Sequence, residues 1–240
     1  MNEKIEQFWE LYADWNSKIN LSAIRTKEDF LTKHIEDSLL PTSWFDFQGK
    51  KILDLGTGGG FPSLPLALYL QYPSLNFVNT TQNQVRTQEV NVTEAKKFPI
   101  TALDAIAKKL KVVQTIATEL GVEIETLHGR AEDFGRDKLY RDQFDVVVTR
   151  AVAKWPTLLE LALPFVAVGG YLLAYQGPAV QESLVTYKGL EKKFGAKLVK
   201  VVKGDVADSE RVFVLLKKIK STPKRFPRPA GIPKKEPLQG

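Results

Sequence analysis

The sequence predicts an α/β protein with a doubly wound, mostly parallel sheet, preceded by a helical layer and closed by an antiparallel strand pair. Three observations predict this fold. Short apolar runs typical of buried strands alternate with helical runs through the middle of the chain. A glycine-rich turn follows the first strand-like run. The last two runs are too close together for a crossover helix between them, so they should pair antiparallel.

The chain should begin with two helices. Apolar and aromatic residues recur at helical spacing over residues 4–19, namely Ile5, Phe8, Trp9, Tyr12, Trp15 and Ile19. We interpret this stripe as core and not as a base-stacking surface. Thr26 to Asp29 resembles a capping box, which predicts a second helix from about Lys27 to Leu40. Residues 1–46 are therefore an N-terminal helical layer.

Residues 47–218 are expected to form the central α/β domain. Five parallel strands are predicted at 51–54, 100–103, 122–127, 144–149 and 171–175, and the antiparallel pair at 198–202 and 211–216. Residues 78–99 are polar without a clear period, and we interpret them as an insertion that could contain a hairpin. The remaining residues, 219–240, form a basic, proline-rich tail.

The glycine-rich turn predicts a nucleotide-cofactor loop. Asp54 ends the first strand, and Gly56 and Gly58 follow it. A dinucleotide-binding fingerprint has the pattern G-x-G-x-x-G/A. Its third glycine position falls at Phe61 when the count starts at Gly56, and at Ser63 when it starts at Gly58, so the match is poor. The Asp54 carboxylate would repel a pyrophosphate and attract a cation, such as the sulfonium and ammonium of S-adenosylmethionine. An antiparallel pair beside five parallel strands also favours a class I, Rossmann-like methyltransferase by fold analogy.

Further candidate residues lie where strands end. Asp104 ends the second strand, where a carboxylate can accept hydrogen bonds from both ribose hydroxyls; the alternative is a helix N-cap. Ala131 and Glu132 follow the third strand and could contact adenine. Arg150 ends the fourth strand and should face the ligand, unless it pairs with a neighbouring carboxylate.

Composition narrows the chemistry. The chain has no cysteine, which excludes disulfides and a cysteine nucleophile and leaves non-covalent methyl transfer. The last 24 residues contain eight Lys and Arg residues and one acidic residue, a charge of +7, so the rest of the chain contributes −1 to the net charge of +6. The five prolines of this tail predict that it is not helical. An extended basic strand would suit the phosphate backbone of a nucleic acid. The alternative is a solvated, disordered terminus. We find no signal peptide or membrane-span pattern, which predicts a cytoplasmic protein.

The pattern as a whole resembles the RsmG (GidB) family, bacterial methyltransferases that modify N7 of one guanine in 16S ribosomal RNA. The resemblance spans nearly the whole chain. It rests on motifs that occur in this order: Trp15-Asn16 with Ile19-Asn20-Leu21-Ser22, His34 with Asp37-Ser38-Leu39, Asp54-Leu55-Gly56 leading to Gly60-Phe61-Pro62, Asp104 with Lys108-Lys109, Arg130-Ala131-Glu132, Thr149-Arg150-Ala151-Val152, and Arg225-Phe226-Pro227-Arg228 with Gly231-Ile232-Pro233.

The resemblance implies S-adenosylmethionine as the cofactor and the small ribosomal subunit, its 16S RNA or an assembly intermediate as the substrate. From the sequence we expect no membrane association and no obligate protein partner. It implies that Gly56, Phe61, Ala131, Glu132 and Arg150 line the cofactor site. The basic residues of the tail are the candidate RNA contacts: Lys224, Arg225, Arg228, Lys234 and Lys235. The chain departs from the family pattern in two places, the predicted insertion and Gln176, where many members have lysine.

Guanine N7 has a free lone pair, so its attack on the methyl carbon needs no catalytic base. We predict that Arg150 orients the guanine. His34 is a candidate catalytic residue, but a single histidine on a helix is more often structural. No metal site is predicted. Two alternatives remain: a ribosome-associated module that binds the cofactor without turnover, and a nicotinamide-dependent oxidoreductase, which Asp54 and Phe61 argue against.

Overall fold

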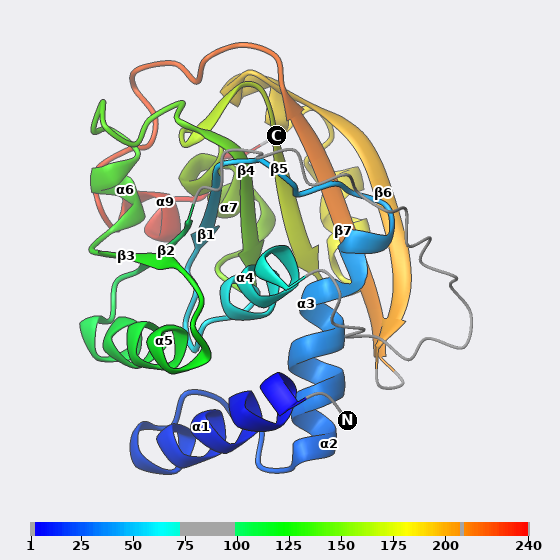
Figure 1. The fold of residues 1–240 in the computed structure, drawn as a ribbon. Coiled ribbons are helices and arrows are strands. Elements are labelled where there is room, and N and C mark those ends of the chain that lie inside the picture. The colour runs from blue at the N-terminus through cyan, green and yellow to red at the C-terminus, as the bar shows by residue number, and fades with distance from the viewer. Residues whose placement is uncertain (1–2, 73–98, 207–208, 240) are drawn as a thin grey trace.

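The structure is a computed structural model that describes residues 3–72, 99–206 and 209–239. Its centre is a seven-stranded sheet in the order β3-β2-β1-β4-β5-β7-β6 (Figure 1). The strands are β1 (Ile52–Leu55), β2 (Ile100–Asp104), β3 (Ile124–His128), β4 (Phe144–Arg150), β5 (Val166–Gln176), β6 (Ala196–Val206) and β7 (Ser209–Lys218). Strands β1 to β5 pair in parallel, and β7 pairs antiparallel with both β5 and β6, which confirms the predicted topology.

The observed β5 begins before the predicted strand at 171–175. The added part contains Gly169-Gly170, and a glycine pair more often marks a turn than the interior of a strand. A Cβ at Gly170 would lie 2.6 Å from the backbone oxygen of Asp145, on the neighbouring strand. The absence of a side chain lets the backbones approach, so the strand starts at Val166, opposite Phe144.

The N-terminal helices are the two that the sequence predicts, with one local difference. Helix α1 spans Glu3–Ile19, and the Thr26 hydroxyl accepts a hydrogen bond from the Asp29 N–H as an N-cap. The second helical segment runs as α2 (Lys27–Phe30), a π-helical turn η1 (Leu31–Glu36), α3 (Asp37–Leu39) and a 3₁₀ turn η2 (Leu40–Ser43). A π-helical turn inserts an extra residue per turn, which hydrophobic spacing over a short helix does not reveal.

Helices cover both faces of the sheet. One face packs against the N-terminal layer, α4 (Ser63–Gln71) and α5 (Ala107–Leu120), with the Phe8, Phe30 and Leu64 side chains fully buried. The other face packs against α7 (Trp155–Ala162), α8 (Val180–Thr186), the 3₁₀ turn η3 (Leu190–Phe194) and α6 (Ala131–Phe134). This is the two-sided coverage that a parallel sheet requires.

The tail differs from the prediction that it is not helical. It contains a short helix, α9 (Ile232–Lys235), which packs against α7. Pro233 lies in its first turn, where a missing N–H costs no intrahelical hydrogen bond. Phe226 is 5% exposed and anchors the tail in the second core. Figure 1 shows the tail crossing that side of the molecule to reach α9 beside α6.

Within the described ranges, no helix is long and apolar enough to cross a membrane. The predicted insertion at 78–99 lies outside the described residues except for its last position, Pro99. The division into residues 1–46, 47–218 and 219–240 stays a prediction.

Candidate cofactor and RNA site

The parallel strands bring the predicted site residues to one edge of the sheet. Leu55 of β1 lies beside Leu103 of β2 and Thr149 of β4. Asp104 and Arg150 therefore end their strands on either side of the loop that follows β1. This edge, at the carboxyl ends of the strands, is where open α/β sheets bind ligands.

Two glycines give the loop its shape. Gly56 has φ of +75°, and a Cβ there would lie 2.5 Å from Cγ2 of Val152. Gly58 has φ of +56°, and a Cβ there would approach no atom closer than 3.9 Å, so the space above it is open. The Gly58 N–H donates to Oδ2 of Asp104 at 2.8 Å, which ties the loop to the end of β2. The backbone is thus exposed to a ligand at Gly58.

Asp54 lies beneath this loop and is fully buried. Its Oδ2 accepts a hydrogen bond from the Ser63 N–H at 3.2 Å, whereas Oδ1 has no partner among the described residues. Burial raises the pKa of Asp54 to about 6, and bonds from Thr57 and Ser63 and the charge of Arg150 only partly offset this effect. A buried carboxylate with a free oxygen suits a cationic ligand, because a nearby positive charge stabilises its ionised form.

Asp104 is half-buried, and both of its carboxylate oxygens are held. Oδ1 accepts a hydrogen bond from the Ile106 N–H at 2.8 Å, and Oδ2 accepts one from the Gly58 N–H at 2.8 Å. Each oxygen keeps a further lone pair, so the fixed carboxylate fits the predicted ribose role. Ile106, which the sequence analysis missed, is the N-cap of α5 and is 50% exposed beside Asp104. Its exposed apolar side chain offers a surface for a flat base.

Ala131 and Glu132 begin α6, after β3, but the Glu132 side chain turns toward the tail. Its Oε1 accepts hydrogen bonds from the Gly231 N–H at 2.9 Å and from Nη2 of Arg130 at 3.0 Å. Burial acts to raise the pKa of Glu132, but these donors outweigh it, so the pKa lies below its usual value. The structure thus adds a tail contact to the predicted cofactor role of Glu132, and that role stays a prediction.

Phe61 lies among the aromatic side chains that join the loop to the helical layer. Its ring is 4% exposed and stacks on His34, with centroids 4.0 Å apart and planes at 17°. Phe8 also stacks on Phe61, with ring centroids 5.9 Å apart, and Tyr12 meets the Phe61 ring edge-on at 5.2 Å. The N-terminal layer therefore supports the predicted cofactor loop directly.

Arg150 points into this layer. Its Nη1 donates to Oδ2 of Asp37 at 2.8 Å and to the Lys33 backbone oxygen at 3.2 Å, and its Nη2 lies 3.2 Å from Nδ1 of His34. His34 Nδ1 lies 3.2 Å both from Arg150, which can only donate, and from the Lys33 backbone oxygen, which can only accept. Its Nε2 lies 3.1 Å from the Ser22 hydroxyl. Burial, together with the Arg150 charge, lowers the pKa of His34 to about 3. The ring is therefore neutral at physiological pH.

Asp37 is the centre of this arrangement. Its carboxylate is 2% exposed and binds a second arginine, Arg211 of β7, whose Nε lies 2.8 Å from Oδ1. The motif of His34 with Asp37-Ser38-Leu39 includes Asp37, but no sequence pattern connects Asp37 with either arginine or indicates Arg211. No local signal links residues that are 113 and 174 positions apart.

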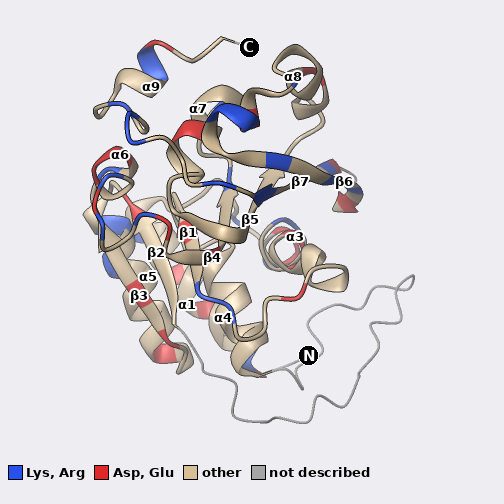
Figure 2. Ribbon diagram, turned by 90° about the horizontal axis from the view of Figure 1, so that it is seen from above, with Lys and Arg blue, Asp and Glu red and all other residues tan. Residues whose placement is uncertain are grey.

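The tail residues fall into two groups. Lys224, Arg225, Lys234 and Lys235 are exposed, and Figure 2 shows basic segments on α9 and on the chain leading to it. Arg228 instead forms an ion pair with Glu160 of α7, a residue that is fully buried. Its Nε and Nη2 contact the two carboxylate oxygens at 2.9 and 2.8 Å. Four of the five predicted RNA contacts are thus free of such a buried pair.

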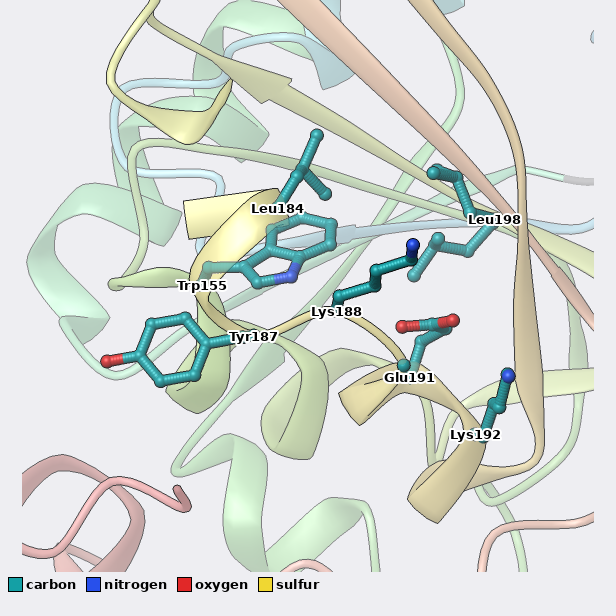
Figure 3. A pocket seen from close by; sticks show the side chains of 9 residues that line it. Trp155, Leu184, Tyr187, Lys188, Glu191, Lys192 and Leu198 are labelled. Carbon is teal, nitrogen blue, oxygen red and sulfur yellow. The ribbon is translucent and has the colours of Figure 1, made fainter. Parts of the chain in front are cut away.

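A cavity of about 400 Å³ lies apart from these residues, between α7, α8, η3 and strands β6 and β7 (Figure 3). The side chains lining it include Trp155, Leu184, Tyr187 and Lys188. None of its lining residues belongs to the predicted cofactor site. In the described part of the chain, no group of three or more acidic or histidine side chains could hold a metal ion.

The strand order and the loop define a class I S-adenosylmethionine-dependent methyltransferase fold. A methyltransferase structure from Pyrococcus furiosus matches with a TM-score of 0.53 and 13% identity, over 92% of this chain and all of that one. A structure of TYW2 from M. jannaschii in complex with AdoMet matches with a TM-score of 0.50 and 14% identity, over 78% of this chain and 76% of that one.

Sequence comparison gives the family. The model of the GidB family, rRNA small subunit methyltransferase G, matches residues 1–86 and 91–212. Curated relatives named ribosomal RNA small subunit methyltransferase G are 37% identical in Clostridium novyi, over 97% of this chain and 87% of the relative, and 38% identical in Desulfitobacterium hafniense, over 98% and 90%. The chain belongs to the GidB family of small-subunit ribosomal RNA methyltransferases.

Proposed function

We propose that this protein transfers a methyl group from S-adenosylmethionine to N7 of a guanine in 16S ribosomal RNA, in the cytoplasm. The observation that carries the proposal is the sheet edge where Asp54, the glycine loop and Asp104 meet, within a chain that belongs to a family of rRNA methyltransferases. The purely parallel sheet expected of a nicotinamide domain is not the sheet found, because β7 is antiparallel.

S-adenosylmethionine is the cofactor, and it supplies an electrophilic methyl group on a positively charged sulfur. The chain offers a matching set of groups for its parts. The open backbone at Gly58 and the fixed carboxylate of Asp104 suit the ribose, and the exposed Ile106 suits the adenine. The buried Asp54 carboxylate suits the positive charge. Ala131, Glu132 and Phe61 remain predicted cofactor contacts.

The reaction needs positioning and not proton removal, because N7 of neutral guanine carries a free lone pair. Arg150 has its two Nη atoms bound to Lys33, His34 and Asp37, so it presents a fixed positive charge at the end of β4. We propose that this charge orients guanine through O6, the acceptor next to N7. His34, which is neutral and buried, acts by holding Arg150 and Phe61, and it need not exchange a proton.

The exposed tail residues Lys224, Arg225, Lys234 and Lys235 are the proposed RNA contacts outside the methylation site. Lysine and arginine side chains with free ends bind phosphates without reading sequence, and this contribution falls as salt rises. The pairing of Arg228 with Glu160 assigns that arginine to holding the tail.

The test is methyl transfer from isotopically labelled S-adenosylmethionine to small ribosomal subunits, and to deproteinised 16S RNA, from cells lacking the enzyme. Nucleoside analysis should find the label in N7-methylguanosine. Label in a different nucleoside would overturn the choice of acceptor atom. Cofactor binding without any transfer would favour a binding module that has lost turnover.

Two variants calibrate this assay. Gly56→Ala should remove activity, because the new Cβ would overlap Val152. Gly177→Ala is the matched control, because a Cβ there meets nothing within 4 Å.

A further inference from the structure

The Asp37 carboxylate is shared between two arginines that come from different strands. Oδ2 binds Nη1 of Arg150 and Oδ1 binds Nε of Arg211, both at 2.8 Å. Only 3% of the Asp37 side chain is exposed, compared with 27% for Arg211. The cluster therefore holds two positive charges and one negative charge at the boundary between the buried layer and the solvent.

The two arginines are held in different ways. Both Nη atoms of Arg150 are bound by protein groups, whereas Arg211 is bound only through Nε. In the described ranges, neither Nη atom of Arg211 has a hydrogen-bond partner. Because the guanidinium is planar, fixing Nε also fixes the plane in which the four N–H bonds of the Nη atoms lie. Arg211 thus presents an oriented pair of donors that have no partner among the described residues.

The position of Arg211 relates it to the methylation site. Val212 pairs with Gln176, the last residue of β5, so Arg211 lies just beyond the carboxyl end of that strand. Arg150 ends the neighbouring β4, and Tyr175 of β5 pairs with it. The free donors of Arg211 are therefore at the same sheet edge as the residue proposed to orient guanine.

We propose that Arg211 binds a phosphodiester group of the RNA substrate next to the target guanine, and that Asp37 is the positioning residue that aims it. A planar guanidinium with two free Nη atoms matches a phosphate, which accepts parallel hydrogen bonds on two oxygens. The excess of one positive charge in the cluster matches the single negative charge of a phosphodiester. This inference rests on the proposed function for the identity of the partner as RNA.

The experiment measures binding to unmethylated small ribosomal subunits, in a series of salt concentrations, for the wild type and four variants. Arg211→Gln removes the positive charge. Arg211→Lys keeps the charge but loses the planar pair of Nη donors. Asp37→Asn removes the carboxylate charge that aims both arginines. Lys50→Ala is the control, because it removes one positive charge just before β1, at the opposite end of the sheet. Affinity for S-adenosylmethionine, kcat and KM are measured in parallel.

We expect Arg211→Gln to weaken subunit binding about tenfold, the effect of losing a hydrogen-bonded charge, and to reduce the salt slope by about 0.7. KM for subunits should rise, while affinity for S-adenosylmethionine stays at the wild-type value. Arg211→Lys should recover part of the affinity and all of the slope, and Lys50→Ala should change neither. Equal binding by Arg211→Gln and the wild type would overturn the inference.

Asp37→Asn separates positioning from charge. Removing a negative charge should strengthen RNA binding if only net charge matters. Positioning predicts the opposite, weaker binding, because Arg211 loses the group that fixes its plane. Tighter binding by Asp37→Asn would overturn the role of Asp37, and if that variant does not fold, Arg211→Gln still decides the phosphate contact. A wild-type enzyme that binds subunits but methylates no N7 would overturn the proposed function and leave the contact to be judged by binding.

Discussion

Arg228→Ala tests whether the basic tail is held by a structural ion pair or is free for RNA. The Glu160 carboxylate has 1% of its side chain exposed, and Arg228 has 22%. Glu160 accepts hydrogen bonds from the Arg228 backbone N–H at 2.8 Å and from the guanidinium at 2.8 to 3.2 Å. Removing the arginine side chain leaves a buried carboxylate with only the backbone donor from this partner.

The magnitude follows from that burial. Leaving one partner of a buried ion pair unpaired costs about 3–5 kcal/mol, and we expect about 2–3 kcal/mol here because water reaches Arg228 and the backbone donor remains. In a chain of this size, that free energy lowers the midpoint of thermal unfolding by about 5–10 °C. Circular dichroism during heating measures this shift.

Two further variants make the test decisive. Arg225→Ala is the matched control, because Arg225 is an exposed arginine of the same tail, and its removal should change stability by about 0.5 kcal/mol or less. Replacing both Glu160 and Arg228 by leucine should recover much of the loss, because no charge remains buried. An unchanged unfolding midpoint in Arg228→Ala, together with weaker subunit binding, would refute the structural role and restore Arg228 to the RNA contacts.

Three other predictions concern the cofactor and the tail. Gly56→Ala should abolish binding of S-adenosylmethionine in calorimetry, because its Cβ would lie 2.5 Å from Val152, and measurable binding would contradict the proposed site. Burial raises the pKa of Asp54 to about 6, and a bound cation favours the ionised form, so cofactor affinity should fall about tenfold between pH 7 and pH 5. S-adenosylhomocysteine, which lacks the sulfonium charge, should show a smaller change, and equal profiles would refute the role of Asp54. Joint replacement of Lys224 and Arg225 by alanine should reduce the salt slope of subunit binding by about 1.4, and an unchanged slope would exclude them as phosphate contacts.

Local pattern was sufficient to predict the sheet because every strand contains an apolar run that the sequence shows, although β5 and β6 extend beyond it. The structure contains all seven predicted strands, two of which form the antiparallel pair. The differences arise where a local pattern has two meanings. Gly169-Gly170 resembles a turn but lies inside β5, and the helix from Lys27 contains a π-helical turn. Both depend on contacts with other elements, which hydrophobic spacing does not record.

The site likewise contains residues that the sequence could locate and contacts that it could not. Strand ends and glycines could be located from the sequence, so Asp54, Gly58 and Asp104 were predicted at the edge where the structure places them. The partners of Arg150 could not be located, because Asp37 lies 113 residues away and is joined to it only by the fold. The alternative that the sequence analysis held open for Arg150, an ion pair with a carboxylate, is the contact found.

The tail shows why composition alone is a weak guide to the role of a basic segment. Its charge and prolines favoured an extended strand along RNA, yet the segment folds onto α7 through Phe226 and Arg228. The Gly231 N–H then reaches Glu132 at the predicted adenine side of the cofactor site.

Both flanking segments of the sheet therefore contact residues of the proposed methylation site. Residues of the N-terminal layer hold Arg150 and stack on Phe61, and the tail holds Glu132. These two segments are not independent of the central domain, although they are separate from it in sequence. Without them, the charges of Arg150 and Glu132 would lose hydrogen-bond partners and the Phe61 ring would be exposed. Loss of the contacts to Phe61 or Glu132 should thus appear as lost cofactor affinity, whereas loss of the exposed tail charges should appear as lost affinity for RNA.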